Sequence, residues 1–444
     1  MRKLFGTDGM RGVAGEPPLD PATTFAAGLA LGKWVSGNHL DPEVVIGMDT
    51  RESGPWIAAN VAAGLEKSGV RARFAGLITT PGIAHGARTG PFAAGVMISA
   101  SHNPYLDNGI KILDHSGFKL PDEVEHALEQ DMFAWLALGE EPAAATLTED
   151  NGLDQAYIDS LAATLPGGLS GLRLAVDASN GAATHLAPAL FERLGATVQR
   201  IHCAPDGKNI NLHCGSQHLE SLRELVIETR ADLGVAFDGD ADRAMFISHS
   251  GKTVDGDAVM LVTALPLQAR GRLTEVIATV MSNLGLEVAL RAHGIGLVRT
   301  PVGDKYVLDE MVRRNAPLGG EQSGHIIFRD YATTGDGLLT ALRVLEVMRS
   351  TGLDLDTLTS TFESYPQLLV NVRVKQRRPL NELPKVIAAS QRAEAEFGHR
   401  GRVLLRFSGT EPLARVMVEG PTLDRVTHHA HSIADAIGLE LGVA

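Results

Sequence analysis

The strongest nucleophile candidate in this 444-residue chain is a serine that follows an apolar segment. The apolar run that begins at Gly95 leads into Ser101, His102 and Asn103, and Pro104 prevents the strand from continuing because it cannot donate to a ladder. Ligands bind at the carboxyl ends of strands in α/β sheets. We therefore predict that an open turn displays Ser101 as a nucleophile, with His102 as a second catalytic candidate. A plain Ser-Asn-Pro turn is the alternative for this segment taken alone.

Three aspartates, Asp238, Asp240 and Asp242, alternate after a second apolar run. Alternate residues of an extended segment share one side, so these carboxylates can converge on one point. Converging carboxylates repel one another unless a cation lies between them, and a compact oxygen site suits Mg²⁺ better than Zn²⁺. An EF-hand calcium loop would need Glu at its twelfth position, where this chain has His249. Arg243 adds a positive charge suited to a phosphate, and an acidic, solvated turn is the alternative.

A glycine turn near the C-terminus combines an arginine with two hydroxyls. Arg406 lies at the end of an apolar run and is followed by Ser408, Gly409 and Thr410. Because Gly409 lets the backbone turn without a Cβ penalty, successive N–H groups can form a nest for an anion. We predict that this turn holds a phosphate, with Arg415 on the following segment as a second ligand. A capped turn and an arginine on a strand face are the alternatives.

A carboxylate, a hydroxyl and an imidazole alternate in a third cluster, made of Glu321, Ser323 and His325. In an extended segment all three could face one pocket, where they could hold the hydroxyl or amino groups of a sugar. His325 could also transfer protons near neutral pH. The alternative is a glycine-flanked hairpin with one incidental histidine.

Two basic residues lie outside these clusters. Arg11 belongs to a segment with three glycines, Gly6–Gly12, which we predict to be too flexible for regular structure unless a ligand or a neighbouring domain orders it. Arg11 could bind a phosphate, although a flexible terminal tail is the alternative. Lys111 follows the Ser101 turn at the end of a short apolar run, where a solvated surface lysine is the default interpretation.

Together these segments resemble the α-D-phosphohexomutase superfamily, from Gly6 to Glu419 and in the family's order. Gln322 is similar to the phosphoglucosamine branch of the superfamily, whereas hexose mutases more often have methionine there. Ala241 departs from the pattern, since the family usually has glycine, but it removes no reacting group. The matching loops are the phosphoserine loop (Ser101–Pro104), the magnesium loop (Asp238–Arg243), the sugar-binding loop (Glu321–His325) and the phosphate-binding loop (Arg406–Pro412).

This resemblance implies a mutase that interconverts glucosamine 6-phosphate and glucosamine 1-phosphate, a step that supplies UDP-N-acetylglucosamine for the cell envelope. It implies a phosphorylated Ser101 that donates its phosphoryl group to the sugar, giving a bisphosphate that also serves as activator. One Mg²⁺ ion would be held by Ser101 and the three aspartates. Arg11, Lys111 and His325 would handle protons or support the transition state, and which of them is the general base stays open.

Three other functions remain open at this stage. A phosphomannomutase or phosphoglucomutase would share every catalytic group and differ only in the sugar that it prefers. A metal-dependent phosphatase would use the same serine and carboxylates but release inorganic phosphate. A non-catalytic sugar-phosphate sensor would keep the phosphate-binding loop and lose the nucleophile, which the intact Ser101 argues against.

Composition bounds the partners and the location. The formal net charge of −13 argues against nucleic acid or anionic lipid, and it would also repel a phosphorylated sugar unless local arginines invert the field at the site. The small amino sugar phosphate that we expect as partner is implied by the family resemblance. The N-terminus lacks the apolar region of a signal peptide, and no apolar run approaches the roughly 18 residues of a membrane helix, so we expect a cytoplasmic protein. Whether it is a monomer or a homodimer stays open.

The two cysteines, Cys203 and Cys214, lie near His202, His213 and His218. Two cysteines are too few for a disulfide scaffold. Their spacing matches none of the usual zinc patterns, so we interpret them as buried or loop thiols.

Strand-like and helical patterns alternate along the chain, which predicts the α/β class. We expect three similar mixed α/β domains and a smaller C-terminal α+β domain around a central cleft, to which each domain contributes one of the four loops. The last domain should be able to hinge and exclude water. The predicted domains are 1–150, 151–250, 251–365 and 366–444.

Overall fold

A computed structural model describes residues 4–6, 8–38, 42–408 and 412–442. The chain divides into two compact units, the first made of Met1–Thr279 with Thr300–Thr359 and the second of Val280–Arg299 with Ser360–Ala444. Among the described residues, no helix combines the length and the apolar character that crossing a bilayer requires.

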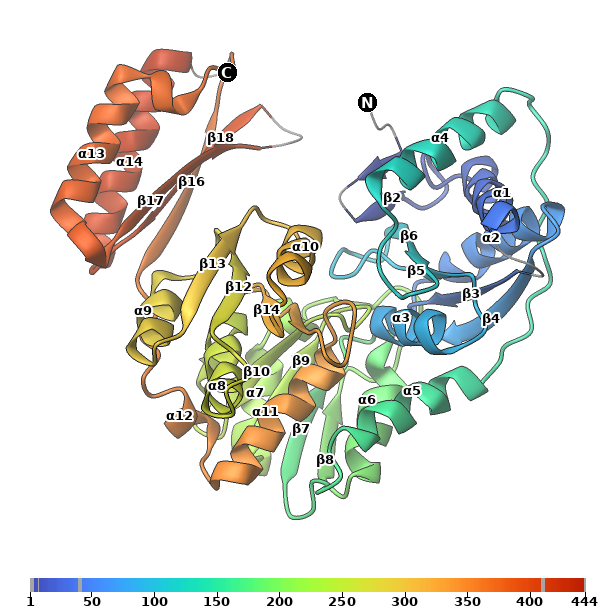
Figure 1. Ribbon diagram of the computed structural model, residues 1–444, viewed down its shortest axis with the longest axis horizontal. Helices are drawn as coiled ribbons and strands as arrows, with labels where there is room; N and C mark the ends of the chain where they lie inside the picture. The colour runs from blue at the N-terminus through green and yellow to red at the C-terminus, as the bar shows by residue number, and fades with distance from the viewer. Residues whose placement is uncertain (1–3, 7, 39–41, 409–411, 443–444) are drawn as a thin grey trace. The chain divides into compact units, whose positions relative to one another are not determined.

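The first unit begins with a six-stranded mixed sheet (Figure 1). In order across the sheet its strands are β1 (Phe5–Gly6), β2 (Gly9–Val13), β6 (Asp107–Asp114), β5 (Ala94–Ile98), β3 (Glu43–Met48) and β4 (Arg71–Leu77). Strand β3 is parallel to β4 and β5, whereas β6 is antiparallel to β5 and β2. All residues of β5 are buried, which explains why the run before Ser101 is continuously apolar instead of alternating.

Helices cover this sheet on both faces (Figure 1). On one face α1 (Pro21–Asn38), α2 (Gly54–Lys67) and α4 (Asp122–Leu136) share a hydrophobic core with the strands. On the other face α3 (Thr80–Thr89) packs against β3 and β5. The strand ends between these layers are therefore the place where polar side chains can gather.

A second sheet of the first unit presents the aspartates. Its strands are, in order, β11 (Thr253–Val254), β10 (Ala244–Ser248), β9 (Leu233–Phe237), β7 (Arg173–Asp177) and β8 (Thr197–Ile201). Strand β7 is parallel to both β8 and β9, and β10 returns antiparallel to β9, so that Asp238–Asp242 falls in the turn between them. The accompanying helices are α5 (Gly152–Ala163), α6 (Ala183–Arg193), the short η1 (Gly215–Gln217) and α7 (Glu220–Thr229).

A third sheet of the same unit presents the residues between positions 321 and 325. Its neighbouring strands are β12 (Glu275–Thr279), β14 (Leu318–Gly320) and β15 (Ile326–Phe328). Strands β14 and β15 form an antiparallel hairpin in which Gly320 pairs with Ile326, so Glu321 to His325 form its loop. The helices here are α8 (Gly256–Ala269), α10 (Asp304–Arg314), α11 (Gly337–Thr351) and α12 (Leu355–Leu358).

The second unit is built on a three-stranded antiparallel sheet in the order β16 (Gln367–Arg373), β18 (Leu413–Glu419) and β17 (Arg402–Phe407). Helices α13 (Pro384–Phe397) and α14 (Leu423–Leu441) lie side by side against it (Figure 1). The remaining elements are α9 (Leu284–Ala292), β13 (Gly296–Thr300), η2 (Leu380–Glu382) and η3 (Gly398–Arg400). Three mixed sheets with their helices, together with a smaller C-terminal α+β fold, confirm the predicted fold class.

Candidate active site

Ser101 lies just beyond β5, where its backbone is left-handed with a φ of 54°. Its hydroxyl donates a hydrogen bond of 2.5 Å to Oδ2 of Asp238, and its backbone N–H donates to Oγ of Ser99 at 2.9 Å. Nδ1 of His102 lies 3.4 Å from the same hydroxyl. Burial, with help from Arg243, lowers the pKa of His102 to about 4, so its ring is neutral at neutral pH.

The Ser101 side chain is buried, at 1% exposure, so the prediction of an open turn is wrong. The turn that carries the aspartates closes over it. A Cβ on Gly239 would lie 2.4 Å from the carbonyl oxygen of Ser101, and glycine is what permits this approach.

The three aspartates converge as predicted, but they do so in a turn and not in the extended segment that the prediction assumed. Asp238 and Asp240 are fully buried and Asp242 is 6% exposed, and each offers a carboxylate oxygen within 4.8 Å of the others. Burial and the neighbouring Asp242 and Asp240 raise the pKa of Asp238 well above its usual value. Burial would do the same to Asp242, but Lys111 and His325 outweigh it and hold the pKa of Asp242 well below its usual value.

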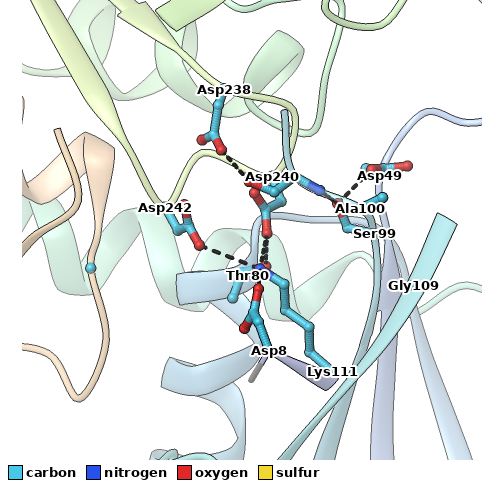
Figure 2. Close-up of polar contacts among 12 residues, drawn as sticks. Asp8, Asp49, Thr80, Ser99, Ala100, Gly109, Lys111, Asp238, Asp240 and Asp242 are labelled. Atoms are coloured by element: carbon cyan, nitrogen blue, oxygen red, sulfur yellow. Dashed lines mark hydrogen bonds and ion pairs between the residues drawn. The ribbon is translucent and has the colours of Figure 1, made fainter. Parts of the chain in front are cut away.

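Lys111 lies against this acidic cluster and not on the surface (Figure 2). Its Nζ is 2.7 Å from Oδ2 of Asp240, 3.3 Å from Oδ2 of Asp242 and 3.4 Å from Oδ2 of Asp8. Burial alone would lower the pKa of Lys111, but the three carboxylates outweigh it and raise that pKa well above its usual value. Lys111 is therefore a permanent cation, and the default interpretation as a solvated lysine is wrong.

The donor set fits a hard divalent cation. Oδ1 of Asp240 is buried and has no hydrogen-bond partner in the described part of the chain, and Oδ1 of Asp242 has long ion-pair contacts, with Nδ1 of His325 at 3.5 Å and Nε of Arg243 at 3.8 Å. Buried carboxylate oxygens without partners are costly unless a cation or a donor satisfies them. Asp238, Asp240, Asp242 and the Ser101 oxygen are together able to hold one Mg²⁺ ion.

Arg51 holds the Ser101 turn through hydrogen bonds to its backbone carbonyl groups, and the sequence analysis did not identify this residue. It is 1% exposed, and its guanidinium donates to the carbonyl oxygens of Ser101 at 2.9 Å, Asn103 at 2.8 Å and Asp107 at 2.9 Å. Its charge is balanced by Asp49, 2.9 Å away. The available signal was a charged pair directly after the buried strand β3. Figure 2 shows the contact of Asp49 with Ser99, whose hydroxyl donates to it at 2.6 Å.

Of the three side chains predicted to hold the sugar, two line a cavity of about 480 Å³. Glu321 and His325 line it, together with polar residues from loops of all three sheets of the first unit. Ser323 is not among the lining residues, and its hydroxyl donates to Oε2 of Glu321 at 3.3 Å. The other charged lining residues are Asp8, Arg11, Asp242, Arg243 and Asp304.

His325 connects the cavity to the acidic cluster. Its Nδ1 lies 3.5 Å from Oδ1 of Asp242, and its Nε2 accepts a hydrogen bond of 3.0 Å from the backbone N–H of Gly335. Burial lowers the pKa of His325, but the carboxylates of Asp242, Asp304 and Glu321 outweigh it and raise the pKa to about 8. Its proton is therefore exchangeable near neutral pH.

The described residues of the N-terminal segment form strands β1 and β2, so the prediction that it is too flexible for regular structure is wrong there. β2 pairs antiparallel with β6, and Arg11 lies opposite Gly109 in this ladder. Asp8 forms ion pairs with Arg11 and Lys119, and Lys119 also binds Asp304 at 2.5 Å. The glycines allow a close backbone approach, since a Cβ on Gly9 would lie 2.3 Å from the oxygen of Ile110.

The predicted phosphate-binding residues belong to the second unit. Arg406 on β17 and Arg415 on β18 face each other in register, and burial and this neighbouring charge lower the pKa of Arg406. Ser408 is buried, and its carbonyl oxygen accepts a hydrogen bond of 2.9 Å from Arg377. Gly409 and Thr410 lie outside the described residues.

Comparison with known proteins agrees with this fold and site. The chain matches the phosphoglucomutase/phosphomannomutase family in all of its parts, namely alpha/beta/alpha domain I over residues 2–137, domain II over 155–251, domain III over 255–365 and the C-terminal domain over 369–436. The chain therefore belongs to this family of phosphohexomutases.

One relative and two solved structures illustrate how similar the chain is to individual proteins. A protein of Solibacter usitatus named phosphoglucosamine mutase is 56% identical over 443 residues, with 99% of each chain covered. A solved phosphoglucomutase/phosphomannomutase family protein from Burkholderia thailandensis has a TM-score of 0.80 at 23% identity, covering 99% of this chain and 98% of its own. Aspergillus fumigatus N-acetylphosphoglucosamine mutase, solved with GlcNAc-6P and magnesium, has a TM-score of 0.66 at 18% identity, covering 98% and 95%. The family and the mutase class predicted from the sequence are confirmed.

Proposed function

We propose that the protein interconverts glucosamine 6-phosphate and glucosamine 1-phosphate. The observation that carries this proposal is the hydrogen bond of 2.5 Å between the Ser101 hydroxyl and Asp238, within a cluster of three convergent carboxylates. The amino sugar is supported by the name of the 56% identical relative. Such a reaction feeds UDP-N-acetylglucosamine synthesis from cytoplasmic sugar phosphates, so we propose a cytoplasmic location.

The reaction is a double phosphoryl transfer. The P–O bond of phosphorylated Ser101 breaks as a free hydroxyl of the sugar phosphate forms a new P–O bond, and the hydroxyl proton passes to a base. The resulting bisphosphate turns over, and its other phosphoryl group returns to Ser101. Ser101 and the three aspartates would hold one Mg²⁺ ion, which when bound would supply positive charge next to the transferred group. A bisphosphate added from solution would phosphorylate Ser101 and so act as activator.

The basic residues divide into fixed charges and a proton carrier. Lys111 stays protonated because of its raised pKa, so it stabilises the equatorial oxygens of the transferred group and is unsuited to act as base. Arg11 and Arg243 line the cavity and add fixed charge there. His325, with a pKa of about 8, is mostly protonated at pH 7, so it is suited to donate a proton and would accept the sugar proton only in its neutral form. His102 is neutral and contacts the Ser101 hydroxyl, which fits a hydrogen-bonding role.

Substrate recognition uses two sets of side chains. Glu321 offers a carboxylate to the ammonium of glucosamine within the cavity, and Ser323 steadies that carboxylate by its hydrogen bond. The non-reacting phosphate would be held by the predicted phosphate-binding residues of the last domain. These are Arg406, Ser408, Gly409, Thr410 and Arg415.

One incubation tests the proposal. Purified protein receives glucosamine 1-phosphate, Mg²⁺ and a catalytic amount of sugar bisphosphate, while ³¹P NMR follows both isomers and inorganic phosphate. We expect glucosamine 6-phosphate without stoichiometric phosphate release, and slower turnover of glucose 1-phosphate. Accumulation of inorganic phosphate would instead identify a phosphatase, and faster turnover of the glucose or mannose phosphate would contradict the amino sugar assignment.

A further inference from the structure

Three side chains that can bind a metal ion lie close together next to the second sheet, outside the site described above. Asp177 ends β7, His202 follows β8, and Cys214 immediately precedes η1. One donor atom from each residue lies within 4.8 Å of the other two. Asp177 is fully buried, Cys214 is 1% exposed and the His202 side chain is 28% exposed.

His202 and Asp177 form a close ion pair whose angles do not meet the geometry of a hydrogen bond. Nδ1 of His202 lies 3.0 Å from Oδ2 of Asp177, yet this nitrogen is buried and has no hydrogen-bond partner among the described residues. Two ligands of one tetrahedral ion, each about 2.0–2.3 Å from it, lie about 3–4 Å apart without a proton between them. The separation of these two atoms, which suits an ion pair, also falls within the range for two ligands of a common ion.

The chemistry of the donors selects the metal. A carboxylate oxygen, an imidazole nitrogen and a thiolate sulfur are the ligands of Zn²⁺ and of its substitute Co²⁺, whereas Mg²⁺ takes oxygen ligands. Three protein ligands leave a fourth tetrahedral position for water. The usual zinc spacings do not apply, because the three ligands come from separate segments of the chain, which is why the sequence favoured plain thiols.

We propose that Asp177, His202 and Cys214 bind one zinc-class transition metal ion. Its place in the fold suggests what the ion does. The segment from 202 to 214 contains no helix or strand, and it carries Asn211, whose side chain donates to the carbonyl oxygens of Ser101 at 2.9 Å and Asn103 at 3.2 Å. The ion would join both ends of this segment to β7 and so fix Asn211 against the Ser101 turn.

Cys203 provides a matched control. It neighbours His202 in sequence, but its Sγ is directed to the carbonyl oxygen of Ile201 at 3.3 Å and it is not part of the cluster. His202 provides a mild variant, because asparagine tolerates the left-handed backbone at this position, where φ is 49°.

Cobalt titration tests the proposal. Chelator-treated protein in excess Mg²⁺, which occupies the aspartate cluster, is titrated with Co²⁺ while near-ultraviolet thiolate charge-transfer and visible tetrahedral bands are recorded. We expect one equivalent to bind in the natural protein and in Cys203→Ser. The bands should vanish in Cys214→Ser, and the affinity should fall more than about tenfold in His202→Asn.

The melting temperature gives a second readout that does not depend on the absorption bands of cobalt. Zn²⁺ should raise the melting temperature of the natural protein and of Cys203→Ser in excess Mg²⁺, but not that of His202→Asn. Circular dichroism confirms that each variant is folded, and His202→Asn carries the test if Cys214→Ser does not fold. Absence of the charge-transfer band in the natural protein, or its loss in Cys203→Ser but not Cys214→Ser, overturns the proposal.

Discussion

At the scale of single residues, the side chains proposed to react could be selected from the sequence, whereas those that position them could not. Ser101 and Asp240 carry their chemistry in their type and spacing. Arg51 acts through contacts with carbonyl groups up to 56 positions away, which no local pattern reveals. The same holds for Lys111, whose burial depends on carboxylates of two other segments.

Arg51 should act on turnover more than on substrate affinity. In Arg51→Lys the charge opposite Asp49 remains, but the planar fork that binds several carbonyl groups is lost. We expect kcat to fall about 10–100-fold with a smaller change in KM, measured by steady-state kinetics. Arg73→Lys is the control, because Arg73 pairs with Glu43 through a similar fork away from the site. Equal effects of both substitutions would contradict the positioning role.

The aspartate turn offers a second test with an internal control. Gly239→Ala introduces a Cβ only 2.4 Å from the carbonyl oxygen of Ser101, so the turn must shift and kcat/KM should fall about a hundredfold. Ala241 in the same turn has a left-handed backbone, at φ 55°, which glycine adopts without strain. Ala241→Gly should therefore keep activity and change the free energy of unfolding by no more than about 1 kcal/mol. Full activity of Gly239→Ala would show that the two turns are not held in contact.

At the scale of elements, strands that are buried on both faces were the easiest to predict. The apolar runs before Ser101 and Asp238 are β5 and β9, which are entirely buried. Helix starts also followed local rules, as where Asp20 accepts a hydrogen bond from the backbone of Thr23 before α1. The strand β2 was missed because its glycines hide a pairing with β6 that lies far away in sequence.

An acid at the start of α11 predicts a pH effect on stability. Asp336 caps that helix and accepts a hydrogen bond of 2.9 Å from Tyr157 of α5, and burial raises its pKa from 3.8 to about 6. Because the folded state holds the proton more tightly, the stabilisation by protonated Asp336 is complete below pH 3.8 and is lost as the pH rises through about 6. The full effect is about 3 kcal/mol.

Thermal melts of Asp336→Asn check this sign. Relative to the natural protein, the variant should gain more melting temperature at pH 7.5 than at pH 5. Asp354→Asn is the matched control, because Asp354 also caps a helix but hydrogen bonds to Thr357 lower its pKa, so it is ionised in the folded and the unfolded state at both pH 5 and pH 7.5 and its difference should stay the same at the two pH values. A pH-independent difference for Asp336→Asn would contradict its raised pKa.

At the scale of the molecule, the described part of the site lies within the first unit and draws on all three of its sheets. Ser101 and Lys111 come from the first sheet, the aspartates from the second, and Glu321 and His325 from the third. The alternation of strands and helices predicted this fold class, because it depends on local periodicity. The distances between loops of different sheets could not be predicted, since they arise from packing between distant segments.

Mg²⁺ should therefore stabilise this unit as a whole, and Lys111 controls by how much. Lys111→Gln removes the cation beside Asp240 and Asp242, so repulsion among the buried carboxylates grows. We expect a lower melting temperature in chelator and a larger rise on adding Mg²⁺ than in the natural protein, with strongly reduced turnover. Lys119→Gln, which affects Asp8 and Asp304 but not the cluster, should keep the natural Mg²⁺ response. An unchanged response in Lys111→Gln would contradict the compensating charge.

The most direct test of the central claim follows the phosphoryl group. Protein treated with glucosamine 1,6-bisphosphate and Mg²⁺ is examined by intact and peptide mass spectrometry, then given glucosamine 1-phosphate. We predict one phosphoryl group on the Ser101 peptide, its transfer to the sugar, and no labelling or turnover in folded Ser101→Ala. Labelling at another residue, or mutase activity in Ser101→Ala, would contradict the account.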